Sequence, residues 1–186
     1  MTHPSITDFV TKLRLIAQEN SSAQSMVDKV RPLVQALVDQ PSWMTAEMEV
    51  CDPQQGFGVH LLHEEPDHRL AVLVAAWLPG RGIPPHDHGT WSVVGGIRGV
   101  ERNIFWKRVD DGTVADRAEL AIDREVDIRP GDLICNFERD IHSVKNEGAD
   151  LTMSLHVYGK HINHTDRYGF DTATHSMKRL TVAIGR

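Results

Sequence analysis

The first forty residues of the chain place apolar side chains at spacings of three and four residues. These positions are Ile6, Phe9, Val10, Leu13, Ile16 and Ala17, and then Met26, Val27, Val30, Leu33, Val34, Leu37 and Val38. Such spacing predicts two amphipathic helices. We expect Thr7 and Asp8 to start the first helix. Residues 20–22 should separate the helices, and Pro32 should begin a new helix or kink the second.

After Pro41 the pattern changes to short apolar runs separated by turn residues. The candidate strands are 47–51, 59–63, 70–77, 92–97, 100–109, 114–122, 126–128, 133–137, 142–146, 151–158 and, in the tail, 180–184. Many short strands without helices between them predict a β-sandwich or β-barrel. We therefore expect one domain over residues 1–186. It would have a helical lead at 1–40, an all-β barrel at 47–158 and an extension at 159–186 that covers the barrel.

Composition narrows the class of partner. The chain has 186 residues, a net charge of -6 and no cluster of Lys and Arg. Nucleic acids and anionic membranes both need a concentrated basic face, so a small molecule is the expected partner. No apolar run is long enough to cross a bilayer, and no signal segment begins the chain, so the expected location is cytoplasmic. Cys51 and Cys135 should be reduced there. The sequence contains no coiled-coil seam, so it predicts no particular oligomeric state.

The most informative residues are three histidines. In a strand, His86 and His88 would leave the same face, so both could direct a ring nitrogen at one point while Asp87 faces away. A closed sheet can bring His142 beside this pair. Three neutral imidazoles with open coordination positions suit iron, copper, nickel or zinc, so we predict a metal site at His86, His88 and His142.

A second polar group lies on a later strand. Ser154, His156 and Tyr158 alternate with apolar residues and share one face, which can be the barrel interior. Serine could hold one nitrogen of the imidazole, and histidine could hold the tyrosine hydroxyl. Tyrosine could then point a donor at bound oxygen or at a substrate carboxylate. The alternative is that these residues line a wet barrel mouth without catalysis.

Two motifs carry a family resemblance. The first is Gly80, five residues, His86-x-His88 and the later Gly99, and the second is Pro130-Gly131-Asp132 followed by His142-x-x-x-Asn146. Together they resemble the two motifs of the cupin barrels, which implies a double-stranded β-helix, or jelly roll. Cupins usually place a glutamate soon after the second histidine, whereas here the first acid after His88 is Glu101. The resemblance therefore implies a three-histidine site without a carboxylate ligand.

Within the cupins, residues 59–158 resemble the thiol dioxygenases of the cysteine dioxygenase type. The Ser154-x-His156-x-Tyr158 strand resembles their hydrogen-bonded relay, and the run from His86 to Trp91 resembles bacterial members that include 3-mercaptopropionate dioxygenases. The resemblance implies Fe(II) as cofactor, and a small thiol and O2 as substrates. Iron held by neutral histidines keeps its double charge, attracts a thiolate and lowers the thiol pKa.

The same resemblance suggests residues that bind substrate. Cysteine-specific members carry an arginine near the position of Val59 or His60, and this chain has none there, which favours a mercapto acid over cysteine. In the mercaptopropionate type an arginine shortly after the tyrosine binds the carboxylate, and Arg167 has that spacing. Arg81 is a second candidate for this role, while Trp91 and His60 could line the pocket.

Three functions stay open at this stage. The leading one is an iron(II) thiol dioxygenase that forms a sulfinate from a carboxylate-bearing thiol. A second uses the same three-histidine site to cleave a diketone, and a third is a cupin that binds a metal or ligand without turnover. His161 and His164 lie in a segment rich in Asn, Asp and Gly, so we expect them in a solvated loop.

Overall fold

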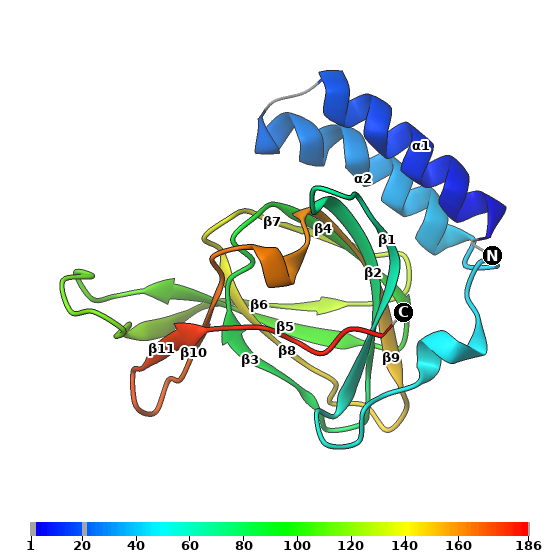
Figure 1. Ribbon diagram of the computed structural model, residues 1–186. Coiled ribbons are helices and arrows are strands. Elements are labelled where there is room, and N and C mark those ends of the chain that lie inside the picture. Colours follow the sequence, from blue (N-terminus) through cyan, green and yellow to red (C-terminus); the bar gives the residue numbers. More distant parts are fainter. Residues whose placement is uncertain (1–2, 20–21, 186) are drawn as a thin grey trace.

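The computed structural model describes residues 3–19 and 22–185, in which two helices are followed along the chain by a series of antiparallel strands and lie above them in the view of Figure 1. The helices are α1 (Pro4–Glu19), α2 (Ala23–Asp39) and the short 3₁₀ helices η1 (Ala46–Glu49) and η2 (Ile162–His164). The strands are β1 (Phe57–Glu64), β2 (Arg69–Trp77), β3 (Gly82–His86), β4 (Ser92–Arg98), β5 (Glu101–Arg108), β6 (Leu120–Ile128), β7 (Leu133–Asn136), β8 (Ile141–Lys145), β9 (Thr152–Lys160), β10 (Tyr168–Phe170) and β11 (Met177–Arg179).

The strand order identifies the fold as a jelly roll. One sheet runs β1-β2-β9-β4-β7 and the other runs β11-β10-β3-β8-β5-β6. From β2 to β9 the chain alternates between the two sheets strand by strand, except that β5 and β6 are neighbours in the second sheet, and these eight strands form two interleaved Greek keys. The predicted all-β barrel with N-terminal helices is therefore confirmed. No helix in the described ranges has the length and apolar character needed to cross a membrane.

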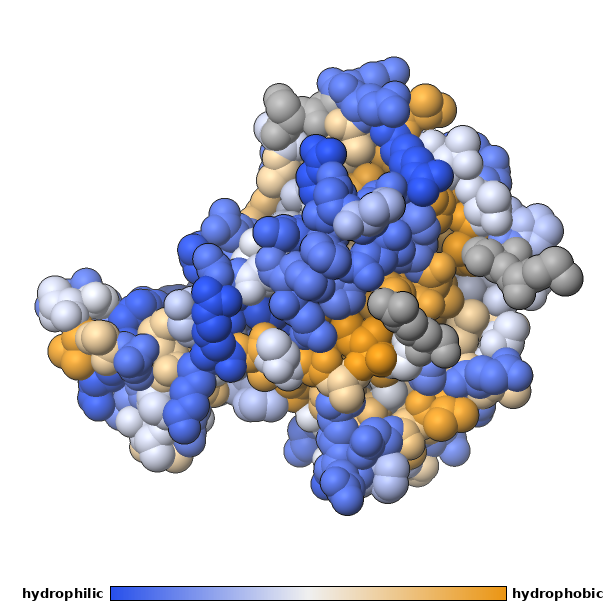
Figure 2. Space-filling model, viewed as in Figure 1, coloured by the Kyte–Doolittle hydropathy of each residue, from blue (hydrophilic) through white to orange (hydrophobic). Residues whose placement is uncertain are grey.

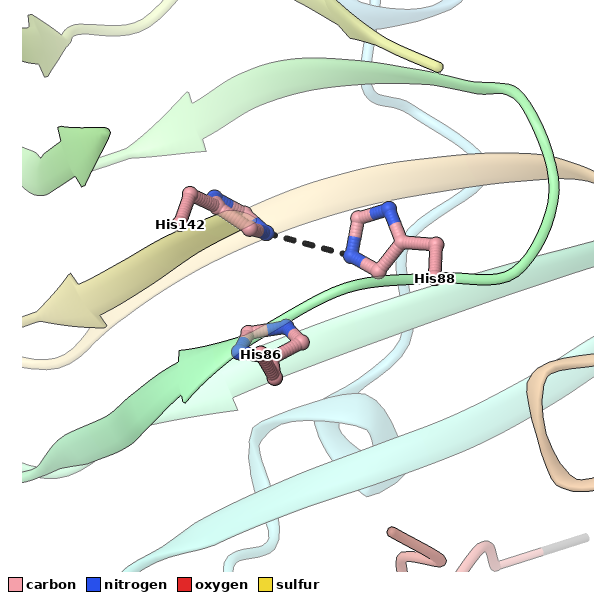
Figure 3. Close-up of side chains that lie close together, drawn as sticks. All are labelled: His86, His88 and His142. Atoms are coloured by element: carbon pink, nitrogen blue, oxygen red, sulfur yellow. Dashed lines mark hydrogen bonds between the residues drawn. The ribbon is translucent and has the colours of Figure 1, made fainter. Parts of the chain in front are cut away.

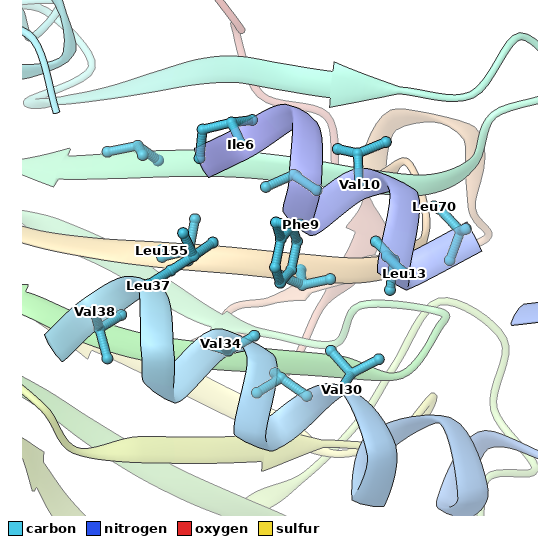
Figure 4. Packing of buried hydrophobic residues seen from close by; sticks show 14 of the residues in the cluster. Ile6, Phe9, Val10, Leu13, Val30, Val34, Leu37, Val38, Leu70 and Leu155 are labelled. Atoms are coloured by element: carbon cyan, nitrogen blue, oxygen red, sulfur yellow. The ribbon is translucent and has the colours of Figure 1, made fainter. Parts of the chain in front are cut away.

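The two helices cover the outer face of the first sheet, where α2 lies against β4, β7 and β9 (Figure 1). Their apolar stripes pack between the helices and the sheet, and Phe9, Val34 and Leu155 are at the centre of this cluster (Figure 4). Fully burying a side chain of this kind contributes about 1.5–3 kcal/mol. The helical layer therefore holds the first sheet in place from outside.

Period-two alternation gives this sheet a second buried face. On β2, Val72 and Val74 face the helices, whereas Leu73 and Trp77 face the opposite sheet. On β9, Leu155 likewise packs against the helices. The residues of β9 that alternate with it, which include all three members of the predicted relay, consequently point between the sheets.

Several predicted boundaries were wrong. Residues 47–51 contain η1 in place of a strand, and Val50 is exposed there. The predicted strands 114–122 and 126–128 are replaced by the single strand β6, because an edge strand paired only with β5 tolerates the exposed polar residues 123–125 that suggested a break. Residues 180–184 form no strand, although neighbouring Gly185 makes a bridge to His60.

The helix boundaries also differ from the expectation. The first helix begins at Pro4, three residues before Thr7, because proline is well suited to the first turn of a helix. Pro32 lies inside the continuous helix α2, which is held by the buried residues Val30 and Val34 on either side of it. Ser22 caps α2 by accepting from the backbone N–H of Ser25, and residues 20–21 lie outside the described ranges.

The surface seen in Figure 2 is mainly hydrophilic, and apolar side chains cover the smaller part of it. Figure 2 shows a face covered mainly by hydrophilic residues, with apolar residues visible between them. The charged residues form exposed pairs such as Arg102 with Glu147 and Arg98 with Glu49. Pairs of this kind contribute only about 0–1 kcal/mol each. These exposed pairs therefore add little to the stability of the fold.

Candidate metal centre

The three predicted ligand histidines meet between the two sheets. His86 is the last residue of β3 and pairs directly with His142 on β8, while His88 lies two residues beyond the end of β3 (Figure 3). All three side chains are buried, and one ring nitrogen from each lies within 4.8 Å of the others. The strand was predicted to include both His86 and His88. It ends at His86, and the following turn, with Gly89 at φ +62°, directs His88 inward.

Hydrogen bonds at Nδ1 orient two of these rings. His86 donates from Nδ1 to the carbonyl oxygen of Pro84 at 2.9 Å, and His142 faces the side-chain oxygen of Asn103 at 2.8 Å. Because both partners are acceptors, each ring keeps its proton on Nδ1 and presents the Nε2 lone pair to the centre. His88 Nδ1 lies 3.2 Å from the hydroxyl of Ser92, which can donate or accept.

The Nε2 atoms of His142 and His88 are only 3.1 Å apart (Figure 3). With a lone pair on His142 Nε2, this contact requires a proton on His88 Nε2. A metal ion would replace that proton, and His88 would then donate from Nδ1 to Ser92. The donor set of three neutral imidazoles thus fits a divalent transition metal.

Burial keeps these histidines neutral. Removal from water lowers the pKa of His142 to about 3, with smaller contributions from the charges of His156 and Arg167. The pKa values of His86 and His88 are also well below the usual value, again chiefly through burial. A neutral imidazole is the form that binds metal, so the site is ready to coordinate an ion at pH 7.

The predicted relay forms a continuous hydrogen-bonded chain on β9. The hydroxyl of Ser154 lies 2.8 Å from His156 Nε2, and His156 Nδ1 lies 2.9 Å from the hydroxyl of Tyr158. The ring of Tyr158 meets the ring of His88 edge-on at 5.1 Å between centroids. Burial lowers the pKa of His156 to about 3 and raises that of Tyr158. The relay therefore ends, neutral and buried, beside a candidate ligand.

Glu101, at the start of β5, is the residue that sequence reasoning missed. Its Oε2 accepts from Ser154 at 2.7 Å and from the indole N–H of Trp77 at 2.8 Å, and its Oε1 accepts from the amide of Asn103 at 3.0 Å. Burial raises the pKa of this carboxyl, while those three hydrogen bonds oppose the rise. The signal in the sequence was the alternation of Glu101, Asn103 and Phe105, which puts an acid and an amide on the inner face of a strand.

A small cavity of about 40 Å³ opens beside the histidines. Its polar lining consists of the three histidines, His156, Tyr158 and Arg167, and its apolar lining is Phe57, Val59, Leu73, Ala75, Trp77, Ile83, Val144, Ile162 and Val182. Arg167 is only 2% exposed, and its Nε has no hydrogen-bond partner among the described residues. Burial lowers the pKa of this guanidinium. An anion in the cavity would satisfy it.

Two predicted pocket residues lie elsewhere, because their side chains do not face the cavity between the sheets. Trp91 packs on the helix side of the sheet, where Gly159 leaves room for its indole, and Ser92 is the neighbour that turns inward. His60 faces away from the cavity and places Nε2 2.9 Å from the carbonyl oxygen of Val50, whereas Val59 lines the cavity. Neither residue is placed to contact a ligand there.

The remaining predicted candidates have structural contacts. Arg81 is exposed and donates to the carbonyl oxygen of Gln54, away from the cavity. Asp87 is buried, and its carboxylate accepts from the backbone N–H of Tyr168 at 2.7 Å. This bond ties the segment that carries Arg167 to the turn between His86 and His88. Asp87 thus positions the C-terminal extension.

The expectation of a solvated loop for two other histidines was half wrong. His164 is exposed, but His161 is buried and caps η2. Glu64, His68 and His164 form a second group of possible metal ligands. However, the rings of His68 and His164 stack at 3.4 Å with planes 9° apart, so their in-plane lone pairs do not converge on one point.

No family model matches the chain. Among solved structures, a protein with a double-stranded β-helix domain from Klebsiella pneumoniae is similar, with 14% identity, a TM-score of 0.48, and 69% of this chain and 91% of that chain covered. KdgF from Halomonas sp. has 13% identity and a TM-score of 0.47, covering 64% and 94%. A cupin superfamily protein from Desulfitobacterium hafniense has 13% identity and a TM-score of 0.45, covering 65% and 87%. The similarity is one of fold.

Proposed function

We propose that this protein is an iron(II) thiol dioxygenase that converts a small carboxylate-bearing thiol, such as 3-mercaptopropionate, to its sulfinate with O2. The observation that carries the proposal is the position of Arg167. Its guanidinium is buried in the same small cavity as three neutral histidines and the tyrosine of the relay. A ligand with a thiol at one end and a carboxylate at the other matches both groups.

The donor set supports iron chemistry. Three imidazoles without a carboxylate leave the full charge of a divalent ion in place, and imidazole ligands suit iron as well as zinc, copper and nickel. A bound Fe(II) would supply the position at which a thiolate and dioxygen meet. The task of the protein is then to hold the thiol in place and to exclude water, which the apolar walls of the cavity favour.

Arg167 selects the other end of the substrate. A buried guanidinium forms two parallel hydrogen bonds with a carboxylate, and it has a strong need for one because its charge is removed from water. No aspartate or glutamate is among the described residues that line the cavity, so no side chain there neutralises an ammonium group. This arrangement favours a mercapto acid over cysteine or cysteamine.

The relay would hold the hydroxyl of Tyr158 beside a thiol or oxygen that enters the cavity. Tyr158 lines the cavity and is fixed by His156, which is in turn fixed by Ser154. A hydroxyl in such a chain can exchange a proton with a ligand without rotating away from it. We therefore assign Ser154, His156 and Tyr158 to proton handling, and His86, His88 and His142 to the metal.

Oxygen uptake tests the proposal. The full chain is reconstituted anaerobically with Fe(II) and supplied with 3-mercaptopropionate, mercaptosuccinate, cysteine, cysteamine or acetylacetone. We expect uptake and a sulfinate product with a mercapto acid, and loss of both in the His86→Ala variant. His164→Ala, which removes an exposed imidazole, is the matched control. Uptake only with acetylacetone would replace the proposal with diketone cleavage, and metal binding without uptake would indicate a binding protein.

A further inference from the structure

One buried carboxylate connects the metal site to the relay. Glu101 reaches His142 through Asn103, and it reaches Tyr158 through Ser154 and His156. Every side chain in these two branches is buried. We propose that Glu101 is a positioning residue that sets the direction of hydrogen bonding in both branches, and so fixes which nitrogen of His142 and of His156 carries the proton.

The branch to the metal site follows from the donor inventory. A carboxylate only accepts, so the amide NH2 of Asn103 must face Glu101 and its oxygen must face His142. His142 must then carry its proton on Nδ1. This leaves a lone pair on Nε2, the atom that faces the other candidate ligands.

The relay branch follows by the same reasoning. Ser154 donates to Glu101, so its oxygen accepts from His156 Nε2–H, and His156 Nδ1 accepts from the Tyr158 hydroxyl. The phenolic oxygen of Tyr158 therefore offers an acceptor to the cavity. In this arrangement, with Glu101 ionised, tyrosine presents an acceptor to the cavity where the sequence predicts a donor.

Trp77 determines which way the amide group would turn if Glu101 were replaced by glutamine. Its indole N–H can only donate, and it binds the same Oε2 that accepts from Ser154. In a Glu101→Gln variant the amide oxygen must stay on this side, so the NH2 group turns toward Asn103. Asn103 then has to flip and donate to His142. His142 would move its proton to Nε2, whereas His156 would keep its proton where it is.

The test reads the tautomers of the imidazoles directly. Long-range ¹H–¹⁵N spectra of the full-length, metal-free protein should show Nδ1–H for His142 and Nε2–H for His156. In Glu101→Gln we expect His142 to change to Nε2–H and His156 to stay the same. Because metal needs Nε2 of His142, zinc affinity measured by chelator competition should fall about 10–100-fold, the usual effect of losing an outer-shell partner.

Two further variants exclude a general loss of structure. Glu125→Gln makes the same chemical change at an exposed residue of β6 and should leave both tautomers and the zinc affinity unchanged. The double variant Glu101→Gln/Asn103→Asp puts an acceptor back in front of His142, so it should restore Nδ1–H and recover zinc affinity. A His142 tautomer that is unaltered by Glu101→Gln, or one that the double variant does not restore, would overturn the inference. None of these readouts requires oxygenase activity, so the inference and the proposed function can fail separately.

Discussion

Replacing Arg167 with methionine should separate the activity of the protein from its stability. The guanidinium is buried, and it forms no salt bridge with an acidic side chain among the described residues; Tyr158 and Asp87 only partly oppose the lowering of its pKa by burial. A buried cation without a partner is unfavourable, and methionine has a similar length without the charge. We therefore expect the melting temperature of Arg167→Met to stay the same or to rise.

Activity should change in the opposite direction. Hydrogen bonds to a charged group are worth about 1.5–3 kcal/mol each, so the loss of a two-bond contact with a carboxylate costs about 3–6 kcal/mol. Since about 1.4 kcal/mol corresponds to a factor of ten, kcat/KM for 3-mercaptopropionate should fall about 10²–10⁴-fold. The assay is oxygen uptake by the Fe(II)-loaded protein, combined with thermal unfolding of the same samples.

The control is Arg81→Met, which removes an exposed arginine that does not line the cavity and should leave kcat/KM unchanged. A thiol without a carboxylate, such as cysteamine, should react equally slowly with the original protein and with Arg167→Met. If Arg167→Met kept its kcat/KM for 3-mercaptopropionate, Arg167 would not be the carboxylate site, and the argument for the substrate class would fail with it.

Three further predictions concern metal binding, pH and packing. His142→Ala should lose bound iron by elemental analysis because it removes one of three candidate ligands, whereas His164→Ala should retain it. The pKa of His156 is about 3 when folded and near 6.5 when unfolded, so stability should fall as pH drops from about 6.5 toward 3, by about 1.4 kcal/mol per pH unit for this group. Urea unfolding should show a shallower pH slope in His156→Asn, and an unchanged slope would contradict the assignment. Phe9→Ala should cost about 3–5 kcal/mol in the same assay while iron content is kept, since Phe9 packs on the helix side of the sheet.

Local patterns predicted the parts of the site that depend on a single strand. Ser154, His156 and Tyr158 lie on one face because side chains alternate along β9, whatever the rest of the fold does. Trp91 was expected in the pocket because it is close to the ligand histidines in the sequence, but it lies just before β4 and packs on the helix side of the sheet. Ser92 is the first residue of β4 and faces inward, so its neighbour cannot.

The role of Glu101 could not be read from the sequence, because its partners come from other strands. Trp77 is on β2 and Ser154 is on β9, and only the jelly-roll order brings both of them to the start of β5. Arg167 is a different case. Its spacing from Tyr158 suggested a role, but its burial follows from contacts that hold the C-terminal extension against the barrel, such as the pairing of β10 with β3 and the bond between Asp87 and Tyr168.

The charges around the cavity connect these observations. The candidate ligands are neutral, so a divalent ion would keep its charge, and Arg167 adds another positive charge to the same wall. Glu101 does not line the cavity, and its three hydrogen bonds are to Trp77, Asn103 and Ser154. A ligand that enters must therefore bring the negative charge itself. A thiolate paired with a carboxylate brings two such charges, whereas the ammonium group of cysteine would place an additional unpaired cation in an apolar space.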